Sequence, residues 1–140
     1  MKSVKDLLTT KPGGFWSIAP NVKVIEALRL LAEKNVGALL VMDGDDLVGI
    51  LSERDYARKV ALMDKTSGET SVSDIMVSPV VTVTPRQTQE DCMTIMTEKR
   101  MRHLPVVDGG RVVGMLSIGD LVKSVIQEQQ ETIQRLYNRF

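Results

Sequence analysis

The sequence is poor in cysteine, histidine and aromatic residues, and it carries no net charge. It holds one cysteine and one histidine in 140 residues, and aromatic side chains make up 4% of it. A single cysteine excludes an intramolecular disulfide and any cysteine-rich metal site. We therefore expect no metal centre, and an enzyme has little support without a cluster of catalytic residue types. Lysine plus arginine balances aspartate plus glutamate at 18 each, so we expect neither nucleic acid nor an anionic membrane as partner.

Long apolar runs and targeting signals are also missing. No run approaches the ~18 apolar residues that a membrane span needs. The N-terminal residues 1–6 lack the apolar core of a signal peptide and the Arg-rich, acid-poor character of a transit peptide. The expectation is a cytoplasmic protein of about one domain.

What the chain does contain is an internal repeat. Shifted by 65 positions, residues 18–58 align with residues 83–123 without a gap, and upstream residues 4–8 match residues 72–76 at a shift of 68. We therefore predict two related copies. The expected division is repeat 1 with its N-terminal segment at 1–63, a linker at 64–71, repeat 2 at 72–126 and a C-terminal helical extension at 127–140.

Each copy is predicted to fold as β-α-β-β-α, which makes the whole chain α+β. In the first copy we expect a short strand at 15–18, an amphipathic helix from Val24 that ends at Gly37, and a buried strand at 38–42. A hairpin turn then leads into a strand at 47–51. One copy is too small to bury much apolar surface alone, so two copies are expected to pack about a pseudo-twofold axis, with two related clefts.

In both copies the last strand runs into a Ser-x-x-Asp step at the start of a helix, Ser52 to Asp55 and Ser117 to Asp120. One interpretation is a capping box, in which serine and carboxylate satisfy the first helical N–H groups. The other is an anion site, because free N–H groups at a helix start attract negative charge. The step alone leaves both open.

The end of the chain breaks the repeat. An apolar stripe continues at helical spacing beyond the point where the first copy stops, over Val122, Val125, Ile126, Gln129, Ile133, Leu136, Tyr137 and Phe140. Such a face is expected to lie on the protein itself or on a second subunit. It is one reason to predict a homodimer.

Taken in order and in duplicate, these marks resemble a tandem pair of CBS domains, the cystathionine β-synthase type module, over nearly all of residues 4–126. They are the strand ends at Pro20 and Pro85, the strands at 37–43 and 103–108, and the two Ser-x-x-Asp steps. The resemblance is to stand-alone CBS pairs, which implies binding of adenosyl ligands (AMP, ATP, NAD or S-adenosylmethionine) and disk-like dimers. The implied function is a regulatory nucleotide sensor that acts on an unknown partner protein. A structural module with empty clefts is the alternative.

The resemblance also implies site residues. Asp55 and Asp120 would accept hydrogen bonds from ribose hydroxyls, and Ser52 and Ser117 would meet phosphate. Arg54 and Arg58 would supply cations in the first copy. The second copy has Ile118 and Gly119 in place of Glu53 and Arg54, so it lacks the Arg54 charge. The remaining expected contacts are Thr82, Val83, Arg102, His103 and Pro105 in the second copy and Ser17, Ile18, Gly37, Ala38 and Leu40 in the first.

The Asp120 cleft is expected to be the principal adenosine site, with phosphate contacts recruited from both copies. His103 is interpreted either as a ligand contact or as a satisfied core or strand-end residue. Trp16 is interpreted as a core residue, with an adenine-stacking wall as the alternative.

Overall fold

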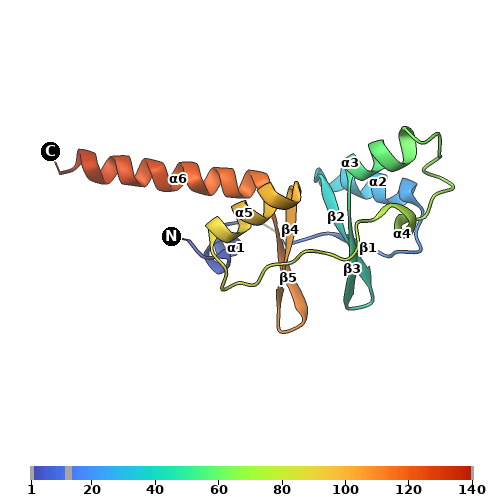
Figure 1. Cartoon of the computed structure of the whole chain (residues 1–140), viewed down its shortest axis with the longest axis horizontal. Helices are drawn as coiled ribbons and strands as arrows, with labels where there is room; N and C mark the ends of the chain where they lie inside the picture. The colour runs from blue at the N-terminus through green and yellow to red at the C-terminus, as the bar shows by residue number, and fades with distance from the viewer. Residues whose placement is uncertain (1, 12–13, 140) are drawn as a thin grey trace. The chain divides into compact units, whose positions relative to one another are not determined.

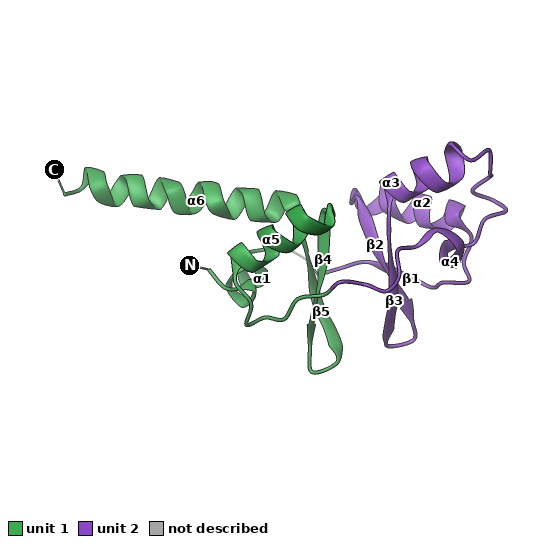
Figure 2. Cartoon of the chain, viewed as in Figure 1, with its two compact units in different colours: residues 1–14, 82–140 green, residues 15–81 purple. Residues whose placement is uncertain are grey.

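The computed structural model describes residues 2–11 and 14–139 and divides into two compact units (Figure 2). Unit 2 is the continuous stretch 15–81, whereas unit 1 combines residues 1–14 with residues 82–140. The units therefore do not follow the repeat boundaries, because the opening segment of each repeat folds with the sheet of the other repeat.

Unit 2 contains a three-stranded sheet in the order β1-β2-β3, with β1 parallel to β2 and β3 antiparallel to it. Its elements are β1 (Ser17–Ile18), α2 (Val24–Lys34), β2 (Ala38–Asp43), β3 (Asp46–Ser52), α3 (Glu53–Tyr56), a π-helical continuation (Ala57–Ala61) and α4 (Val72–Ile75) (Figure 1). The hairpin turn is confirmed, and Gly44 adopts φ 61° there. A positive φ of this kind costs glycine least.

Unit 1 repeats this plan with a two-stranded sheet. Its elements are α1 (Val4–Thr10), α5 (Gln89–Lys99), β4 (His103–Asp108), β5 (Arg111–Ser117) and α6 (Ile118–Tyr137) (Figure 1). Helix α6 continues to Tyr137, beyond the second repeat, while Phe140 lies outside the described residues.

The first strand of the second copy is reduced to one bridge between Val83 and Val106. Pro105 explains the reduction. In unit 2 the equivalent Leu40 donates its N–H to the carbonyl of Trp16 at 3.0 Å, and proline has no N–H to give. Two hydrogen bonds remain, from the Val83 N–H to the Pro105 carbonyl at 3.0 Å and from the Val107 N–H to the Val83 carbonyl at 2.8 Å, so one bridge stands where β1 has two paired residues.

The exchanged opening helices are held by backbone hydrogen bonds. In unit 1 the N–H of Val4 donates to the carbonyl of Gln87 at 2.8 Å, and in unit 2 the N–H of Val72 donates to the carbonyl of Val22 at 2.9 Å. Val4 and Val72 are both fully buried. Each helix is therefore part of the core that it joins.

Apolar residues fill both cores, as the helix and strand patterns predict. The unit 2 core is Val24, Ala27, Leu31, Leu39, Val41, Leu51, Val60, Val72 and Ile75. Buried apolar residues of unit 1 include Val4, Leu7, Cys92, Met96, Leu104, Val106, Leu116 and Leu121.

Two expectations for the first copy were wrong. Helix α2 ends at Asn35, which takes the left-handed conformation with φ 54°, and not at Gly37. Asparagine tolerates that conformation better than most residues. Trp16 is 46% exposed and not a core residue; the Lys34 Nζ lies 4.3 Å from its ring centroid.

Candidate functional site

Both Ser-x-x-Asp steps form capping boxes, so the capping interpretation is confirmed. In unit 1 the Asp120 Oδ2 accepts a hydrogen bond from the Ser117 N–H at 2.8 Å, and the Ser117 Oγ accepts one from the Asp120 N–H at 3.1 Å. In unit 2 the corresponding distances for Asp55 and Ser52 are 2.9 and 3.2 Å. A cap of this kind fixes the carboxylate at the point where strand passes into helix.

A lysine holds the carboxylate in each unit. The Lys11 Nζ lies 2.9 Å from the Asp120 Oδ2 and also donates to the Met115 carbonyl. The Lys59 Nζ lies 3.4 Å from the Asp55 Oδ1 and donates to the Ile75 carbonyl at 3.0 Å.

Sequence reasoning missed both lysines. Lys59 follows Asp55 by four residues, a spacing that brings side chains together on one helical turn, so that pair could have been found. Lys11 is distant in sequence from Asp120, and the position that matches it in the repeat is Pro79. No pattern within either copy points to that pair.

The Lys11 contact governs the electrostatics of the unit 1 cap. Burial alone would raise the pKa of the Asp120 carboxyl, but hydrogen bonds from Lys11 and Ser117 and the Lys11 charge outweigh it, so the pKa lies below its usual value. Burial lowers the pKa of His103, and Lys11 and Arg102 lower it further against the opposing effect of Asp120. The carboxylate is thus held ionised beside a histidine that favours its neutral form.

Several other expected residues of the second copy lie next to this cap. His103 pairs with Ser117 across the β4–β5 ladder, and the carbonyl of Arg102 accepts a hydrogen bond from the Ile118 N–H at 2.8 Å. The side chains of Arg102 and Ile118 are exposed, and so is Gly119. The cap therefore has accessible groups around a half-buried carboxylate.

Thr82, Val83 and Pro105 form the adjoining edge of unit 1. Thr82 is exposed, whereas Pro105 is buried and Val83 is 1% exposed. Val83 also donates its N–H to Pro105. A ligand on this edge would meet the Thr82 side chain and the backbone.

The first copy brings its expected residues together in the same way. Ser17 and Ile18 pair with Leu40 and Val41 in the parallel ladder, and the Gly37 carbonyl accepts a hydrogen bond from the Glu53 N–H at 3.2 Å. Leu40 and Ala38 are buried, at 0% and 1% exposure. The side chains of two expected contacts, Arg54 and Arg58, are exposed.

Neither a metal centre nor a bilayer-spanning helix is found in the described part of the chain. Across residues 2–11 and 14–139, no three His, Cys, Asp or Glu side chains gather as a metal site would require. Within the same ranges, no helix combines the length and apolar character needed to cross a membrane.

The family model for the CBS domain matches twice, at residues 4–62 and 72–127. The chain belongs to the CBS domain family. Both matches contain a capping box of the kind described above, and together they support a tandem CBS pair. The α+β fold predicted for such a pair is confirmed by solved CBS-domain structures.

Relatives of this CBS pair extend from plants to bacteria. It is 41% identical over 118 residues to the mitochondrial CBS domain-containing protein CBSX3 of Arabidopsis thaliana, covering 81% of this chain and 57% of that one. It thus spans little more than half of the plant protein. The structure of a protein with CBS domains from Burkholderia ambifaria is 51% identical, with a TM-score of 0.87 over 91% of this chain and 96% of that one.

Two further solved structures contain ligands. CBSX2 in complex with AMP is 32% identical with a TM-score of 0.75, over 92% of this chain and 99% of that one. The CBS domain pair of protein MJ0100, in complex with 5′-methylthioadenosine and S-adenosyl-L-methionine, is 27% identical with a TM-score of 0.80, over 91% and 98%. CBS pairs similar to this one therefore bind adenosine compounds of different charge.

Proposed function

We propose that this CBS pair is a regulatory module that binds an adenosine nucleotide of the AMP, ATP or NAD type, with the Asp120 cap of unit 1 as the principal site. The observation that carries the proposal is the Asp120 carboxylate, kept ionised and partly accessible at the Ser117 cap beside His103. Ribose hydroxyls are donors that such an acceptor suits. The AMP-bound and S-adenosylmethionine-bound CBS structures support the choice of adenosine ligands.

Removing the carboxylate tests the proposal. Asp120→Ala deletes a charge-assisted hydrogen bond, which costs on the order of 1.5–3 kcal/mol, or more than tenfold in affinity. Isothermal titration with AMP, ATP and NAD measures the loss, and native mass spectrometry of freshly purified protein identifies any ligand retained. Wild-type protein that binds none of the three ligands would contradict the proposal and favour a structural module with empty clefts.

A binding role is proposed in preference to catalysis. An enzyme would show steady turnover of a nucleotide, and that turnover would be lost in Asp120→Ala. We expect incubation with ATP to leave the nucleotide intact by chromatography. We also propose a cytoplasmic location. The plant relative is named as mitochondrial, so cell fractionation is needed to distinguish the two compartments.

We also propose that the module acts as a homodimer through α6. Residues Val122, Ile126, Gln129, Ile133 and Leu136, here called the tail stripe, recur at alternating intervals of four and three and are exposed. The alternation is that of a coiled-coil seam. In such a seam Ile126 and Ile133 occupy the a positions, where β-branched residues favour a two-stranded coiled coil, while Val122, Gln129 and Leu136 occupy the d positions.

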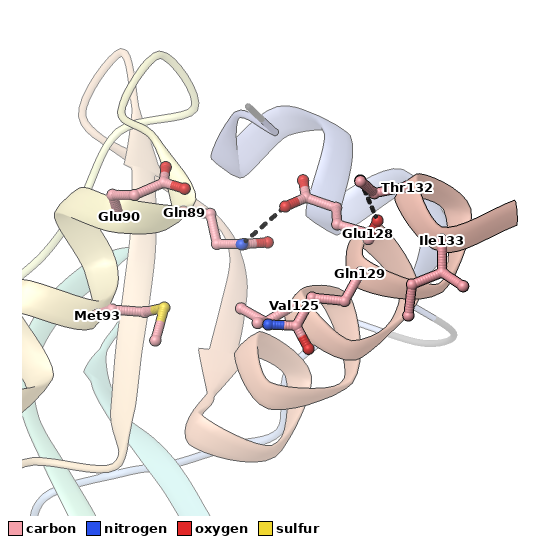
Figure 3. A pocket seen from close by; sticks show the side chains of 8 residues that line it. All are labelled: Gln89, Glu90, Met93, Val125, Glu128, Gln129, Thr132 and Ile133. Atoms are coloured by element: carbon pink, nitrogen blue, oxygen red, sulfur yellow. Dashed lines mark hydrogen bonds between the residues drawn. The ribbon is translucent and has the colours of Figure 1, made fainter. Parts of the chain in front are cut away.

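A groove beside the tail stripe extends the apolar surface. It measures about 560 Å³ and lies between α5 and α6. Figure 3 shows Met93 from α5 and Val125 and Ile133 from α6 around it. Ile133 belongs to both surfaces and is 57% exposed, so a second copy that covered the stripe would bury it.

Sedimentation at tens of micromolar tests the dimer. Ile133→Glu and Leu136→Glu place charges in the seam and should shift the protein to monomer, whereas Gln134→Glu, off the stripe on the same helix, should not. A wild-type monomer, or equal behaviour of all three variants, would contradict the role of the stripe.

A further inference from the structure

We propose that Lys11 makes the Asp120 site selective for adenosine compounds that carry a phosphate, over neutral or cationic ones such as 5′-methylthioadenosine and S-adenosylmethionine. The inference rests on the proposed function, because it concerns the charge of the ligand that the site takes. The shared fold leaves this question open, since CBS pairs similar to this one bind ligands of either kind.

Lys11 is positioned by an anchored helix and is not a chance surface contact. Helix α1 buries Val4 and Leu7, at 0% and 4% exposure, and the Lys5 N–H donates to the Pro85 carbonyl at 3.0 Å. Lys11 is the C-cap residue of this helix. The helix that holds the Lys11 ammonium beside the cap is therefore part of the unit 1 core.

Among residues 2–11 and 14–139, the Lys11 ammonium has two partners. It contacts the Asp120 Oδ2 at 2.9 Å and donates to the Met115 carbonyl, while an ammonium has three donors. Its side chain is 21% exposed and that of Asp120 is 26% exposed. The described residues thus leave one donor for a ligand oxygen, in surroundings where charge acts more strongly than in open water.

The ligand that completes this arrangement is an anion. A sugar whose hydroxyls donate to Asp120 brings its other substituents within a few ångströms of the neighbouring ammonium. A phosphate there would gain a hydrogen bond from the Lys11 ammonium and a favourable charge interaction. A sulfonium would meet a like charge, which is the repulsive element on which selectivity depends.

Unit 2 lacks this arrangement in the same form. Its lysine, Lys59, lies on the same helix as Asp55, 3.4 Å from the carboxylate, with 45% of the side chain exposed. A more solvated ammonium discriminates less between ligand charges, because water screens it. The selectivity is therefore assigned to the Asp120 site.

Isothermal titration of AMP, adenosine and S-adenosylmethionine into wild type and three variants tests the inference. In Lys11→Met, AMP should lose about tenfold or more in affinity, roughly 1.4 kcal/mol, while adenosine changes by less than about threefold and S-adenosylmethionine does not weaken. Lys11→Arg keeps the charge and should retain AMP binding. Lys5→Met removes an equal charge from the exposed side of α1 and is the matched control.

The outcomes separate this inference from the proposed function. Equal losses for AMP and adenosine in Lys11→Met would mean that Lys11 only holds Asp120 in place, and an unchanged AMP affinity would mean that it contributes nothing; either result overturns the selectivity and leaves nucleotide binding intact. Wild-type protein that binds neither AMP nor adenosine would overturn both the selectivity and the proposed function. If Lys11→Met fails to fold in a thermal scan, Lys11→Gln, which keeps a donor for Met115, replaces it.

Discussion

The two caps differ in the helix that each one begins and in the origin of the lysine that holds it. Ser117 and Asp120 begin a 20-residue α-helix, whereas Ser52 and Asp55 begin four α-helical residues that continue as a π-helical segment. In unit 2 the lysine comes from the same helix, and in unit 1 it comes from α1. The same capping box is therefore combined with two different cation sources.

Ser124 accounts for the absence of a lysine at the matching position of α6. It occupies the position in α6 that Lys59 occupies in the first copy, and it is buried, with its Oγ donating to the Gln89 side chain of α5. A lysine would bring an ammonium into that buried contact at a large desolvation cost. The two units thus differ both at this packing position and in the segment that supplies the lysine.

The opening helices provide the largest test of the comparison. Leu7→Ala in α1 and Ile75→Ala in α4 each remove a buried side chain and should destabilise the protein by about 2–5 kcal/mol in urea. Hydrogen exchange should rise within residues 82–126 for Leu7→Ala and within residues 15–62 for Ile75→Ala. Exchange that tracks the repeat boundaries instead would contradict the exchanged helices.

Two matched glycines give a smaller effect. A Cβ on Gly49 would collide with the Met76 side chain, approaching its Cγ to 2.8 Å, while one on Gly114 would approach only the terminal Cδ2 of Leu8 to 2.7 Å. A branch tip gives way more easily than a mid-chain atom. Gly49→Ala should cost about 1–3 kcal/mol, and Gly114→Ala less, by urea denaturation. A larger loss of stability in Gly114→Ala than in Gly49→Ala would contradict these two contacts.

The two capping serines should differ slightly in what their removal costs. Ser52→Ala and Ser117→Ala each leave an aspartate N–H without its Oγ acceptor, at a cost of about 1 kcal/mol. The Ser52 hydroxyl also donates to the Asp55 Oδ2 at 2.9 Å, so Ser52→Ala should cost more than Ser117→Ala. Thermal unfolding of both variants, with Ser73→Ala as an exposed control, measures the difference. If Ser117→Ala leaves the stability unchanged, the unit 1 cap does not contribute to it.

The smallest expected effect concerns the charge around His103. As the only histidine, it can be monitored by proton NMR without ambiguity. Its pKa should lie below the ordinary value, rise in Lys11→Met and fall further in Asp120→Asn. The linked stability is fully present above the unfolded pKa of about 6.5 and decreases as pH falls toward the folded pKa. A His103 pKa unchanged in Lys11→Met would contradict the position of Lys11.

Much of the fold was predictable because it is periodic and duplicated. The helix from Val24, the hairpin at Asp43 to Asp46 and both capping boxes are encoded in local patterns that the repeat states twice. The reduced first strand of unit 1 depends on the single missing N–H of Pro105, which no periodicity reveals. Trp16 was misjudged because size and apolarity favour burial, while its position beside Lys34 leaves it half exposed.

The site was less predictable than the fold. Strand register and a three-residue step determine the positions of Ser117, Asp120 and His103 relative to one another, so the repeat was enough to group them. Lys11 reaches Asp120 only because α1 folds with the second repeat. That contact depends on tertiary structure and has no counterpart in the aligned copies.

The most direct test of the Asp120 cap as the principal adenosine site is isothermal titration of AMP into wild type, Asp120→Ala and Asp55→Ala. We predict that Asp120→Ala lowers the affinity by more than about tenfold, while Asp55→Ala costs clearly less. Unchanged affinity in Asp120→Ala together with lost binding in Asp55→Ala would contradict this assignment, since the site would then lie at the cap whose lysine comes from its own helix.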